Sequence, residues 1–415
     1  MMHMNKRFLL LYLFVGLFLT AGAHSIPVGK NRAVKQIREA IRQAKDGDTL
    51  LVDAGEYREG NLVIDKAITL IGKDMPLLDG QHRYEVLSVK SDHVRIQGFR
   101  IYNSAKSAIS DPGGIKAYRV NYLQIENNEL QDNYYAIYLQ YSTHVLIRNN
   151  RIRAHQQVES QSGNGIHCWK GDSLQIIGNQ IEGHRDGIYF EFVTGSVIWR
   201  NISKNNLRYG LHFMFSNDDA YIGNYFKNNG AGVAVMFSKR VNMMHNTFSE
   251  NWGDAAYGLL FKELADCYLS GNTFEKNTTG IFFDGSNRMT IERNIFKANG
   301  WGMRLQANCM DNEIRHNYFV GNTFDVTTNG TLTLNHFELN YWDKYEGYDL
   351  DNDHIGDVPF RPLSLYALII EQNPPAMLLF RSFMVDLLER SEKIIPTLTP
   401  ENFIDRKPLM KPYTL

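Results

Sequence analysis

The chain has 415 residues, and its 44 Lys and Arg against 45 Asp and Glu give a formal net charge of −1. A chain this close to neutral lacks the basic field on which nucleic-acid binding depends, so that class of function is disfavoured. Apolar residues make up 43% of the sequence, enough to fill a sizeable core. The cysteines Cys168, Cys267 and Cys309 are too few and too scattered for a disulfide framework or a paired-cysteine metal site.

The N-terminus has the composition of an export signal. Lys6 and Arg7 precede an apolar run over 8–20, and small residues occupy 21–23. This order predicts a secretory signal over 1–23 that is removed after Ala23. A single transmembrane anchor is the alternative, but it needs roughly 20 apolar residues. We therefore expect a soluble mature protein outside the cytoplasm.

A short amphipathic helix is predicted next, within a capping segment over 24–47. The apolar residues of this helix lie at Val34, Ile37, Ala40, Ile41 and Ala44. Their helical spacing leaves one apolar face. We expect that face to cover the open end of the first coil, because an uncovered sheet edge invites aggregation. Strands are predicted to follow at 49–53, 62–65 and 68–72.

From residue 125 onward, a short apolar strand followed by asparagine recurs along the chain. The asparagines that mark it are Asn128, Asn150, Asn179, Asn201, Asn224, Asn246, Asn272, Asn294 and Asn317. Their successive intervals are 22, 29, 22, 23, 22, 26, 22 and 23 residues, and glycines from Gly165 to Gly302 keep the same step. A period near 22 residues is too short for a helix pair or a propeller blade. The strands are also rich in β-branched and aromatic residues. We predict an all-β fold, a right-handed parallel β-helix or pectin-lyase-like solenoid, over 48–345.

The constant interval also predicts where the asparagines lie. Each one is expected at the same bend, stacked on the next coil, so that its side chain satisfies turn amides along a ladder. The two longest intervals predict loops near 154–164 and 252–257. Insertions of this kind commonly mark a binding face.

Strand alternation predicts which side chains face outward. In the strand over 210–215, Leu211, Phe213 and Phe215 are expected to enter the core, which turns His212 and Met214 outward. The same count in neighbouring coils gives two exterior columns. The first contains Tyr138, His167, Tyr189, His212 and Ala234, and the second contains Gln140, Trp169, Glu191, Met214, Met236, Lys262 and Asp284. Adjacent coils lie about 4.8 Å apart, so His212, Met214 and Met236 are predicted neighbours.

An imidazole beside two thioethers is a suitable ligand set for Cu(I), because thioether sulfur selects the softer metal. The sequence therefore predicts a candidate copper site at His212, Met214 and Met236, with Glu191 one coil away and His167 two coils away. In the alternative interpretation, this strip of methionine and aromatic residues only contacts another protein.

Sugar chemistry is the rival class, because parallel β-helices also host polysaccharide lyases, hydrolases and epimerases. Such sites need clustered carboxylates, or calcium ligands with a positioned base. The exterior columns place no two acidic residues on adjacent coils. Arg185 and Asp186, at the turn before Gly187, could act on a sugar, although they could equally brace that turn. We expect a non-catalytic protein.

An acidic loop is predicted over 346–362, after the last coil. Asp349, Asp351, Asp353 and Asp357 have the alternate spacing of a calcium-binding loop. His354 stands where such a loop uses glycine, and Phe360 stands where it uses a bidentate glutamate. Calcium binding is one interpretation, and an acidic turn that caps the final coil is the other.

The last segment, over 363–415, changes character. Apolar stretches over 364–370 and 376–388 are separated by Asn373-Pro374-Pro375. The second stretch is about 13 residues long, too short to span a bilayer. We expect an amphipathic helical tail that docks on the end of the β-helix or on a membrane partner. Removal of the chain from Ser364 onward is expected to leave a folded β-helix.

Taken together, these residues resemble the NosD family of exported maturation proteins for nitrous oxide reductase. The resemblance covers nearly the whole chain. Its most specific parts are Gly-Leu-His-Phe-Met over 210–214 and the end of the tail, Asp-Arg-Lys-Pro-Leu-Met-Lys-Pro, over 405–412. The stretch His-Arg-Asp-Gly-Ile-Tyr-Phe-Glu-Phe over 184–192 is similar to the family as well. His354 departs from the family pattern, in which glycine is usual.

The resemblance implies a periplasmic protein that works with an ABC transporter, made of a membrane permease and a cytoplasmic ATPase. It implies a role in assembling the copper-sulfide centre of nitrous oxide reductase, with a copper chaperone lipoprotein as a further partner and copper as a transient ligand. The apolar tail is then expected to contact the permease at the membrane. The exterior His and Met face is expected to receive copper or the client enzyme. The alternative function is that of a β-helix polysaccharide lyase or uronan epimerase.

Overall fold

The computed structural model describes residues 24–107, 109–155, 157–253, 256–330, 334–394 and 403–412. The export signal predicted over 1–23 lies outside the described residues. Within the described ranges, no helix combines the length and the apolar character needed to cross a membrane.

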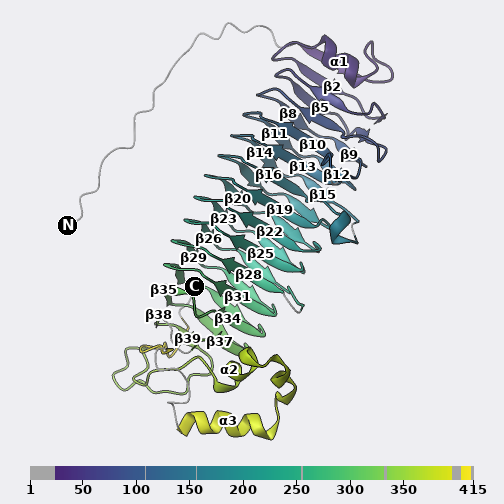
Figure 1. Cartoon of the computed structure of the whole chain (residues 1–415). Coiled ribbons are helices and arrows are strands. Elements are labelled where there is room, and N and C mark those ends of the chain that lie inside the picture. Colours follow the sequence, from purple (N-terminus) through teal and green to yellow (C-terminus); the bar gives the residue numbers. More distant parts are fainter. Residues whose placement is uncertain are drawn as a thin grey trace, which may run out of the picture.

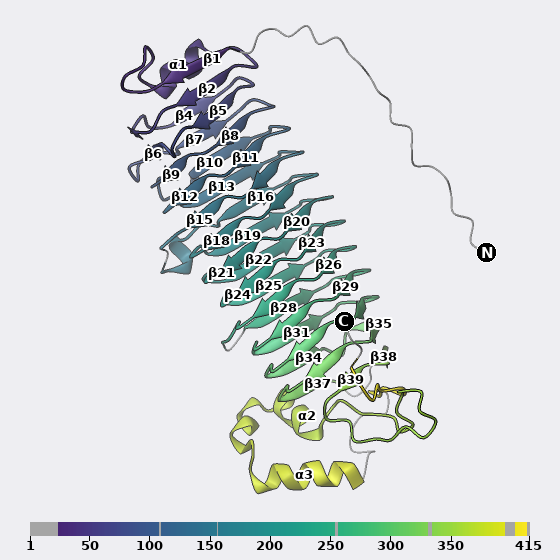
Figure 2. The same ribbon diagram turned by 180° about the vertical axis from the view of Figure 1, so that it is seen from behind.

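The chain winds into a right-handed parallel β-helix, as predicted (Figure 1). Each full coil contributes one short strand to each of three sheets, in the order sheet A, sheet B, sheet C. The three sheets contain 14, 13 and 12 strands. Figure 2 shows the same stack of coils from behind. Because every coil lies on its predecessor, residues about 22 positions apart become direct neighbours across a parallel pair.

The strands of sheet A are β1 (Ser25–Val28), β2 (Thr49–Val52), β5 (Thr69–Gly72), β8 (Arg95–Gln97), β11 (Gln124–Glu126), β14 (Leu146–Arg148), β17 (Gln175–Ile177), β20 (Val197–Trp199), β23 (Ala220–Ile222), β26 (Asn242–Met244), β29 (Tyr268–Ser270), β32 (Thr290–Glu292), β35 (Met310–Arg315) and β38 (Leu334–Glu338). The strands of sheet B are β3 (Glu56–Tyr57), β6 (Leu77–Asp79), β9 (Arg100–Tyr102), β12 (Glu129–Gln131), β15 (Arg151–Arg153), β18 (Gln180–Glu182), β21 (Ile202–Lys204), β24 (Tyr225–Lys227), β27 (Thr247–Ser249), β30 (Thr273–Glu275), β33 (Ile295–Lys297), β36 (Tyr318–Val320) and β39 (Tyr341–Trp342). The strands of sheet C are β4 (Leu62–Ile64), β7 (Leu87–Val89), β10 (Gly113–Tyr118), β13 (Tyr135–Gln140), β16 (Ile166–Trp169), β19 (Asp186–Glu191), β22 (Tyr209–Met214), β25 (Ala231–Met236), β28 (Tyr257–Lys262), β31 (Thr279–Asp284), β34 (Trp301–Leu305) and β37 (Phe324–Thr328).

Stacked apolar side chains fill the interior of the β-helix. The inward residue of the sheet A strands is apolar from Leu50 in β2 to Phe337 in β38 and is buried throughout. In sheet B the rings of Phe226, Phe248, Phe274, Phe296 and Phe319 stack with centroids 4.7 to 5.5 Å apart. The same inward face is repeated coil after coil, so strands of three residues bury a continuous core.

An asparagine ladder runs along the bend between sheets A and B, as predicted. The Oδ1 of Asn150 accepts the backbone N–H of Asn128 at 3.0 Å, and its Nδ2 donates to the carbonyl of Ile125 at 2.9 Å. All nine predicted asparagines belong to this ladder, which continues to Asn340. The side chains therefore satisfy buried turn amides that the strands leave unpaired.

A second asparagine ladder, which the sequence analysis missed, follows the bend between sheets B and C. Its members are Asn206, Asn229, Asn251, Asn277, Asn299 and Asn322. His184 precedes Asn206 in this ladder, and its backbone N–H donates to Oδ1 of Asn206 at 3.2 Å. The run from Asn206 to Asn322 thus begins two coils after the coil that carries the long insertion over 154–164.

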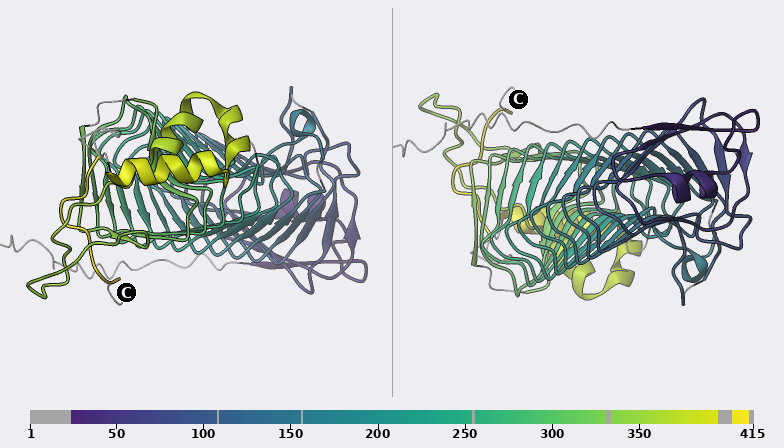
Figure 3. Two further views of the ribbon diagram at one scale, coloured as in Figure 1. Left: turned by 90° about the horizontal axis from the view of Figure 1, so that it is seen from below. Right: turned by 90° about the horizontal axis from the view of Figure 1, so that it is seen from above.

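Helices cover both ends of the stack (Figure 3). The first coil is capped by α1 (Ile37–Gln43), which buries Ile37 and Ala40 and packs against β1, β2 and β4. At the other end lie α2 (Leu365–Gln372), η2 (Pro374–Leu379) and α3 (Phe383–Ile394). The α2 helix packs on β37, and its Glu371 forms an ion pair of 2.8 Å with Arg304 of β34. These helices confirm the capping helix and the helical tail that were predicted.

The end of the chain returns to the last coil, so the predicted docking tail consists of two different parts. Residues 403–412 bridge to β38 and β39, and Phe403 and Asp405 are fully buried. Oδ2 of Asp405 accepts the backbone and side-chain N–H groups of Asn340 at 3.0 and 3.1 Å, and the indole N–H of Trp342 at 3.1 Å. A carboxylate thus closes the asparagine ladder. A chain cut before Ser364 would lose this closure at the last coil, and the folding of such a shortened chain stays a prediction.

Candidate functional site

Both exterior columns lie on sheet C in the predicted register. Backbone pairing aligns Tyr138, His167, Tyr189, His212 and Ala234 in the first, and Gln140, Trp169, Glu191, Met214, Met236, Lys262 and Asp284 in the second. Met214 and Met236 are therefore direct neighbours on adjacent strands, and His212 lies two residues from Met214 on the same face. The predicted juxtaposition of these three residues is confirmed.

Phe215, which was expected in the core, lies on the outside. It follows β22 at the bend, where its φ of 51° falls in the left-handed region that bulky residues rarely adopt. Its ring is 39% exposed and stacks between those of Phe192 and Phe237, with centroids 5.1 and 5.0 Å apart. The alternation of side chains ends with the strand, so a period-two count fails at this position. The exposed rings form a ridge beside the methionines.

The first column is more buried than an exterior position suggests. His167, Tyr189 and His212 are 8%, 9% and 4% exposed. Their rings contact one another in order, the first pair tilted and the second edge-to-face, with centroids 4.6 and 4.9 Å apart. The insertion over 154–164, which includes η1 (Glu159–Gln161), contacts this column through Asn164. The column is thus an internal stack beneath a loop, and only the second column faces outward.

The contacts of Asn164 fix the tautomer of His167. Its Oδ1 accepts N–H groups from Nε of Arg185 at 3.2 Å and from the backbone of Asp186 at 3.3 Å, so its Nδ2 is the donor that lies 3.0 Å from Nδ1 of His167. The ring proton of His167 is therefore on Nε2. Burial, together with the charge of Arg185, lowers the pKa of His167 to about 3. His167 is neutral, and its lone pair is already engaged, which makes it a weaker ligand candidate than His212.

His212 has unpaired nitrogens beside a buried carboxylate. Among the described residues, neither Nδ1 nor Nε2 has a hydrogen-bond partner, and Nδ1 lies 3.7 Å from Oδ2 of Asp186. Asp186 is fully buried, and Arg208 donates to both of its oxygens at 2.8 and 2.5 Å. Burial opposes ionisation of Asp186, but the hydrogen bonds and the charge of Arg208 outweigh it and lower the pKa to about 2. The imidazole therefore lies against a fixed anion.

Tyr189 connects this imidazole to the thioethers. Its ring contacts that of His212, and its hydroxyl lies 3.4 Å from Sδ of Met214 and 3.3 Å from Oε2 of Glu191. Met214, Met236 and Glu191 are half-buried, so their donor atoms are on the accessible side of the group. Tyr189 thus contacts an imidazole with unpaired nitrogens, the thioether of Met214 and a carboxylate, and Met236 adds a second thioether from the adjacent strand. The imidazole and the two thioethers are donors that fit Cu(I).

The acidic loop brings together three of its four candidate residues. One carboxylate oxygen from each of Asp349, Asp351 and Asp353 lies within 4.8 Å of the others. Asp349 also accepts the backbone N–H groups of Asp353 and His354 at 3.2 and 3.0 Å. Asp357 turns away to accept the N–H of Leu350 at 2.7 Å. The loop is thus braced by its own amides, and calcium binding there stays a prediction.

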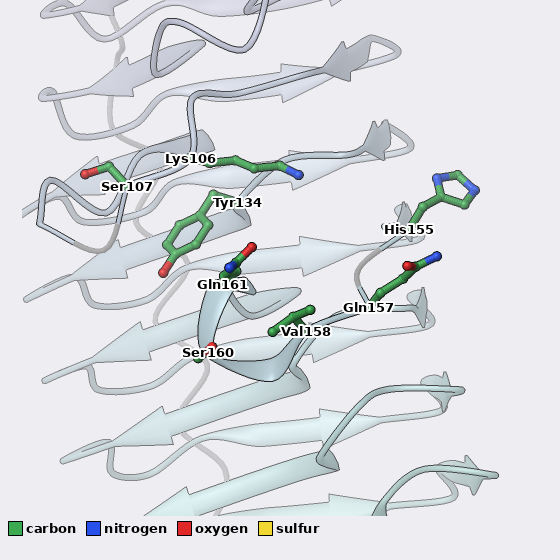
Figure 4. Close-up of a pocket in the computed structure, with 8 residues that line it drawn as sticks. All are labelled: Lys106, Ser107, Tyr134, His155, Gln157, Val158, Ser160 and Gln161. Atoms are coloured by element: carbon green, nitrogen blue, oxygen red, sulfur yellow. The ribbon is translucent and has the colours of Figure 1, made fainter.

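A pocket of about 500 Å³ opens beside the buried column, between two loops of the N-terminal half (Figure 4). It is lined by Lys106, Ser107, Tyr134, His155, Gln157, Val158, Ser160 and Gln161. The ring of Tyr134 meets that of Tyr135 edge-to-face, and Tyr135 in turn contacts His167, with centroids 5.0 Å apart in both pairs. The sequence analysis predicted the loop over 154–164 that forms one wall of this pocket, but not the pocket itself or its wall at Lys106 and Ser107, because loop side chains carry no periodic signal.

Exposed apolar side chains gather at the helical end of the molecule. This surface, which we call the tail patch, consists of Leu378, Leu379, Phe380, Phe383, Met384 and Leu387. Leu378 and Phe383 are 91% and 81% exposed. Val385 of α3 is buried instead, in a small core with Tyr366 and Ile370 of α2. One side of α3 thus packs on the protein while another carries apolar residues into solvent, which is typical of a binding surface.

Comparisons with known proteins point to one family. A family model described as "Periplasmic copper-binding protein (NosD)" matches residues 152–347. A protein of Pseudomonas aeruginosa named "Probable ABC transporter binding protein NosD" is 28% identical over 431 aligned positions, which cover 89% of this chain and 90% of that protein. A protein of the same name from Stutzerimonas stutzeri is 30% identical over 119 residues, covering 28% of this chain and 27% of that protein.

Among solved structures, the Dettilon tailspike protein is similar, with a TM-score of 0.52 and 14% identity over 72% of this chain and 66% of that one. A likeness at this level supports the fold alone. The coil repeat, the matched model and the near full-length relative agree, and all three make this chain similar to the NosD family.

Proposed function

We propose that this chain is a periplasmic copper-binding accessory protein of an ABC transporter, and that it serves the assembly of the copper-sulfide centre of nitrous oxide reductase. The descriptions of its relatives support the coarser part of this proposal, since one names periplasmic copper binding and the other names an ABC transporter. The partners are the permease with its ATPase, a copper chaperone lipoprotein and the reductase. Copper is cargo in this role, so its ligands must release it as readily as they bind it.

The observation that carries copper handling is the juxtaposition of His212, Met214 and Met236 on β22 and β25. His212 supplies a nitrogen from the buried side, and Met214 and Met236 supply sulfur from the accessible side. Neutral thioethers bind Cu(I) without the charge that would make the site a permanent one. Glu191 lies at the rim of the same group.

The copper site is tested by removing the donor atoms while keeping the shapes of the side chains. In a variant with His212→Phe, Met214→Leu and Met236→Leu, we expect the affinity for Cu(I) to fall at least tenfold, which corresponds to about 1.4 kcal/mol. The measurement is competition for Cu(I) against a chromogenic chelator. The matched control, Met244→Leu with His336→Phe, removes the same atom types from the outer face of sheet A and should bind as the unaltered protein does. If the two variants bound Cu(I) with equal affinity, the copper site at these residues would be refuted.

The transporter role is tested on the tail patch. Leu378→Ser with Phe383→Ser should abolish co-purification with the permease from detergent-solubilised membranes, because the apolar surface that docks is lost. Both side chains are exposed, so the melting temperature should stay unchanged. Arg381→Ala with Asp386→Ala, which alters exposed polar positions of the same segment, serves as the control. Permease recovered in full with the serine variant would contradict docking through this patch.

The sugar-active alternative is weakened by the surroundings of its candidate acid. Asp186 is fully buried, and both of its oxygens are bound by Arg208. A carboxylate held in this way is not presented to a polysaccharide.

A further inference from the structure

Asp186 lies next to the candidate copper ligand His212 without belonging to the donor set. It begins β19 and pairs in register with Tyr209 of β22, so it lies toward the start of the strand on which His212 and Met214 follow. Its Oδ2 is 3.7 Å from Nδ1 of His212. The carboxylate therefore lies beside the imidazole, at the register position of Tyr209, whereas Met214 follows His212 on the strand.

Arg208 turns this carboxylate into a fixed anion. The guanidinium donates from Nε to Oδ1 at 2.8 Å and from a terminal nitrogen to Oδ2 at 2.5 Å, and the backbone N–H of Tyr209 donates to Oδ1 at 3.3 Å. A bidentate pair of this kind sets the plane of the carboxylate as well as its charge. Asp186 cannot rotate away from His212 without breaking these bonds.

The imidazole is also held by its neighbours. The rings of Tyr189 and Tyr209 contact it, with centroids 4.9 and 4.8 Å away. A ring confined between two aromatic side chains keeps one edge toward Asp186. Nε2 then remains as the nitrogen without a partner among the described residues.

We propose that Asp186 is a positioning residue for copper, which accepts the Nδ1–H of His212 and so fixes the tautomer whose Nε2 lone pair is offered to Cu(I). The gap of 3.7 Å closes to hydrogen-bond distance with a small rotation of the ring. A carboxylate behind a metal-binding histidine orients the ring and raises the basicity of the free nitrogen. The inference rests on the proposed function for the identity of the metal. The tautomer of His212 does not depend on the metal and can be measured in the metal-free protein.

The tautomer is measured first, on the metal-free full-length protein with nitrogen-15-labelled histidine. We expect the His212 signals of the unaltered protein to show the proton on Nδ1, with His212→Phe identifying those signals. In Asp186→Asn the carboxylate is lost and the amide can donate to Nδ1, so the proton should move to Nε2. An Nε2–H tautomer in the unaltered protein would overturn the proposal, even if Asp186→Asn fails to fold.

Affinity for Cu(I) is measured next, by the same chelator competition. Asp186→Asn should bind Cu(I) 10- to 100-fold more weakly, roughly the cost of removing such a partner at known metal sites. Glu159→Gln is the matched control, since Glu159 is the exposed second carboxylate of Arg208, at 3.9 Å, and leaves the Asp186 pair intact. Unchanged affinity in Asp186→Asn, with copper still bound through His212, overturns this inference and leaves the proposed function standing. A complete failure of the unaltered protein to bind Cu(I) overturns the proposed function instead.

Discussion

Replacement of Asp219 by asparagine is expected to stabilise the protein at neutral pH and to remove a decline in its stability between about pH 4 and pH 8. Asp219 is buried, with 1% of its surface exposed. Its Oδ1 accepts the backbone N–H of Ser196 at 2.8 Å, while its Oδ2 has no hydrogen-bond partner among the described residues. Burial raises the pKa of Asp219 from 3.8 to about 8. The folded protein therefore keeps this side chain protonated at pH 7.

The direction of the effect follows from proton binding. Below pH 4 the group is protonated in both the folded and the unfolded chain, so it costs nothing. Between pH 4 and pH 8 only the unfolded chain releases the proton, and the free energy of unfolding falls by about 1.4 kcal/mol per pH unit. The cost reaches up to about 4 kcal/mol at pH 7. Asparagine does not titrate, but its amide lacks an acceptor here, so we expect a net gain of about 2 kcal/mol.

The measurement is the free energy of unfolding in urea at pH 4, 5.5 and 7, for Asp219→Asn and for the unaltered protein. Taking the difference between the two proteins cancels the titration of all other groups. Asp218→Asn is the control, because that neighbouring carboxylate is exposed and paired with Arg240. Because Arg240 lowers the pKa of Asp218, the contribution of Asp218 itself falls mainly below pH 4, so the decline between pH 4 and pH 8 should remain in this variant. A difference for Asp219→Asn that does not vary with pH would refute the buried protonated state.

Asp405→Ala is expected to lower the free energy of unfolding by about 3 kcal/mol. The change leaves two buried N–H groups of Asn340 and the indole N–H of Trp342 without their acceptor, and each such group costs about 1 kcal/mol or more. Asp405→Asn is the informative comparison, because it keeps an acceptor oxygen at the position that asparagine fills in the other coils. We expect it to behave almost as the unaltered protein does.

Thermal unfolding measures the overall loss, and hydrogen exchange shows where it occurs. The amides of β38 and β39 should exchange faster in Asp405→Ala, while those of the central coils stay protected, since each coil of a solenoid contacts only its neighbours. Equal stability of the alanine and asparagine variants would show that Asp405 does not close the ladder.

The parts of the fold that repeat were predictable, and the reason is visible at Asn128 and its successors. A side chain that must return to the same bend in every coil leaves a constant interval in the sequence, and that interval fixed the register of His212, Met214 and Met236 in advance. The second ladder, from Asn206 to Asn322, has the same kind of interval and could have been found in the same way.

Features that depend on a single non-repeating contact were not predictable. Phe215 lies outside the core because β22 ends one residue earlier, at Met214. The pattern of apolar residues in the sequence does not show where a strand ends. The burial of His212 depends on its packing against Tyr189 and Tyr209, and its pairing with Asp186 depends on Arg208. The return of Asp405 to the last coil likewise follows from one contact far along the chain.

The stacking of the coils has a consequence for the distance between the two proposed working parts. Sheet C passes through five strand-to-strand steps from β22, which carries the thioether and imidazole donors, to β37, on which α2 packs. At the usual separation of parallel strands, this amounts to about 24 Å. The solenoid thus acts as a rigid spacer. Its length is set in increments of one turn, so adding or deleting a whole turn would move the proposed metal site relative to the tail patch by about 5 Å without altering either surface.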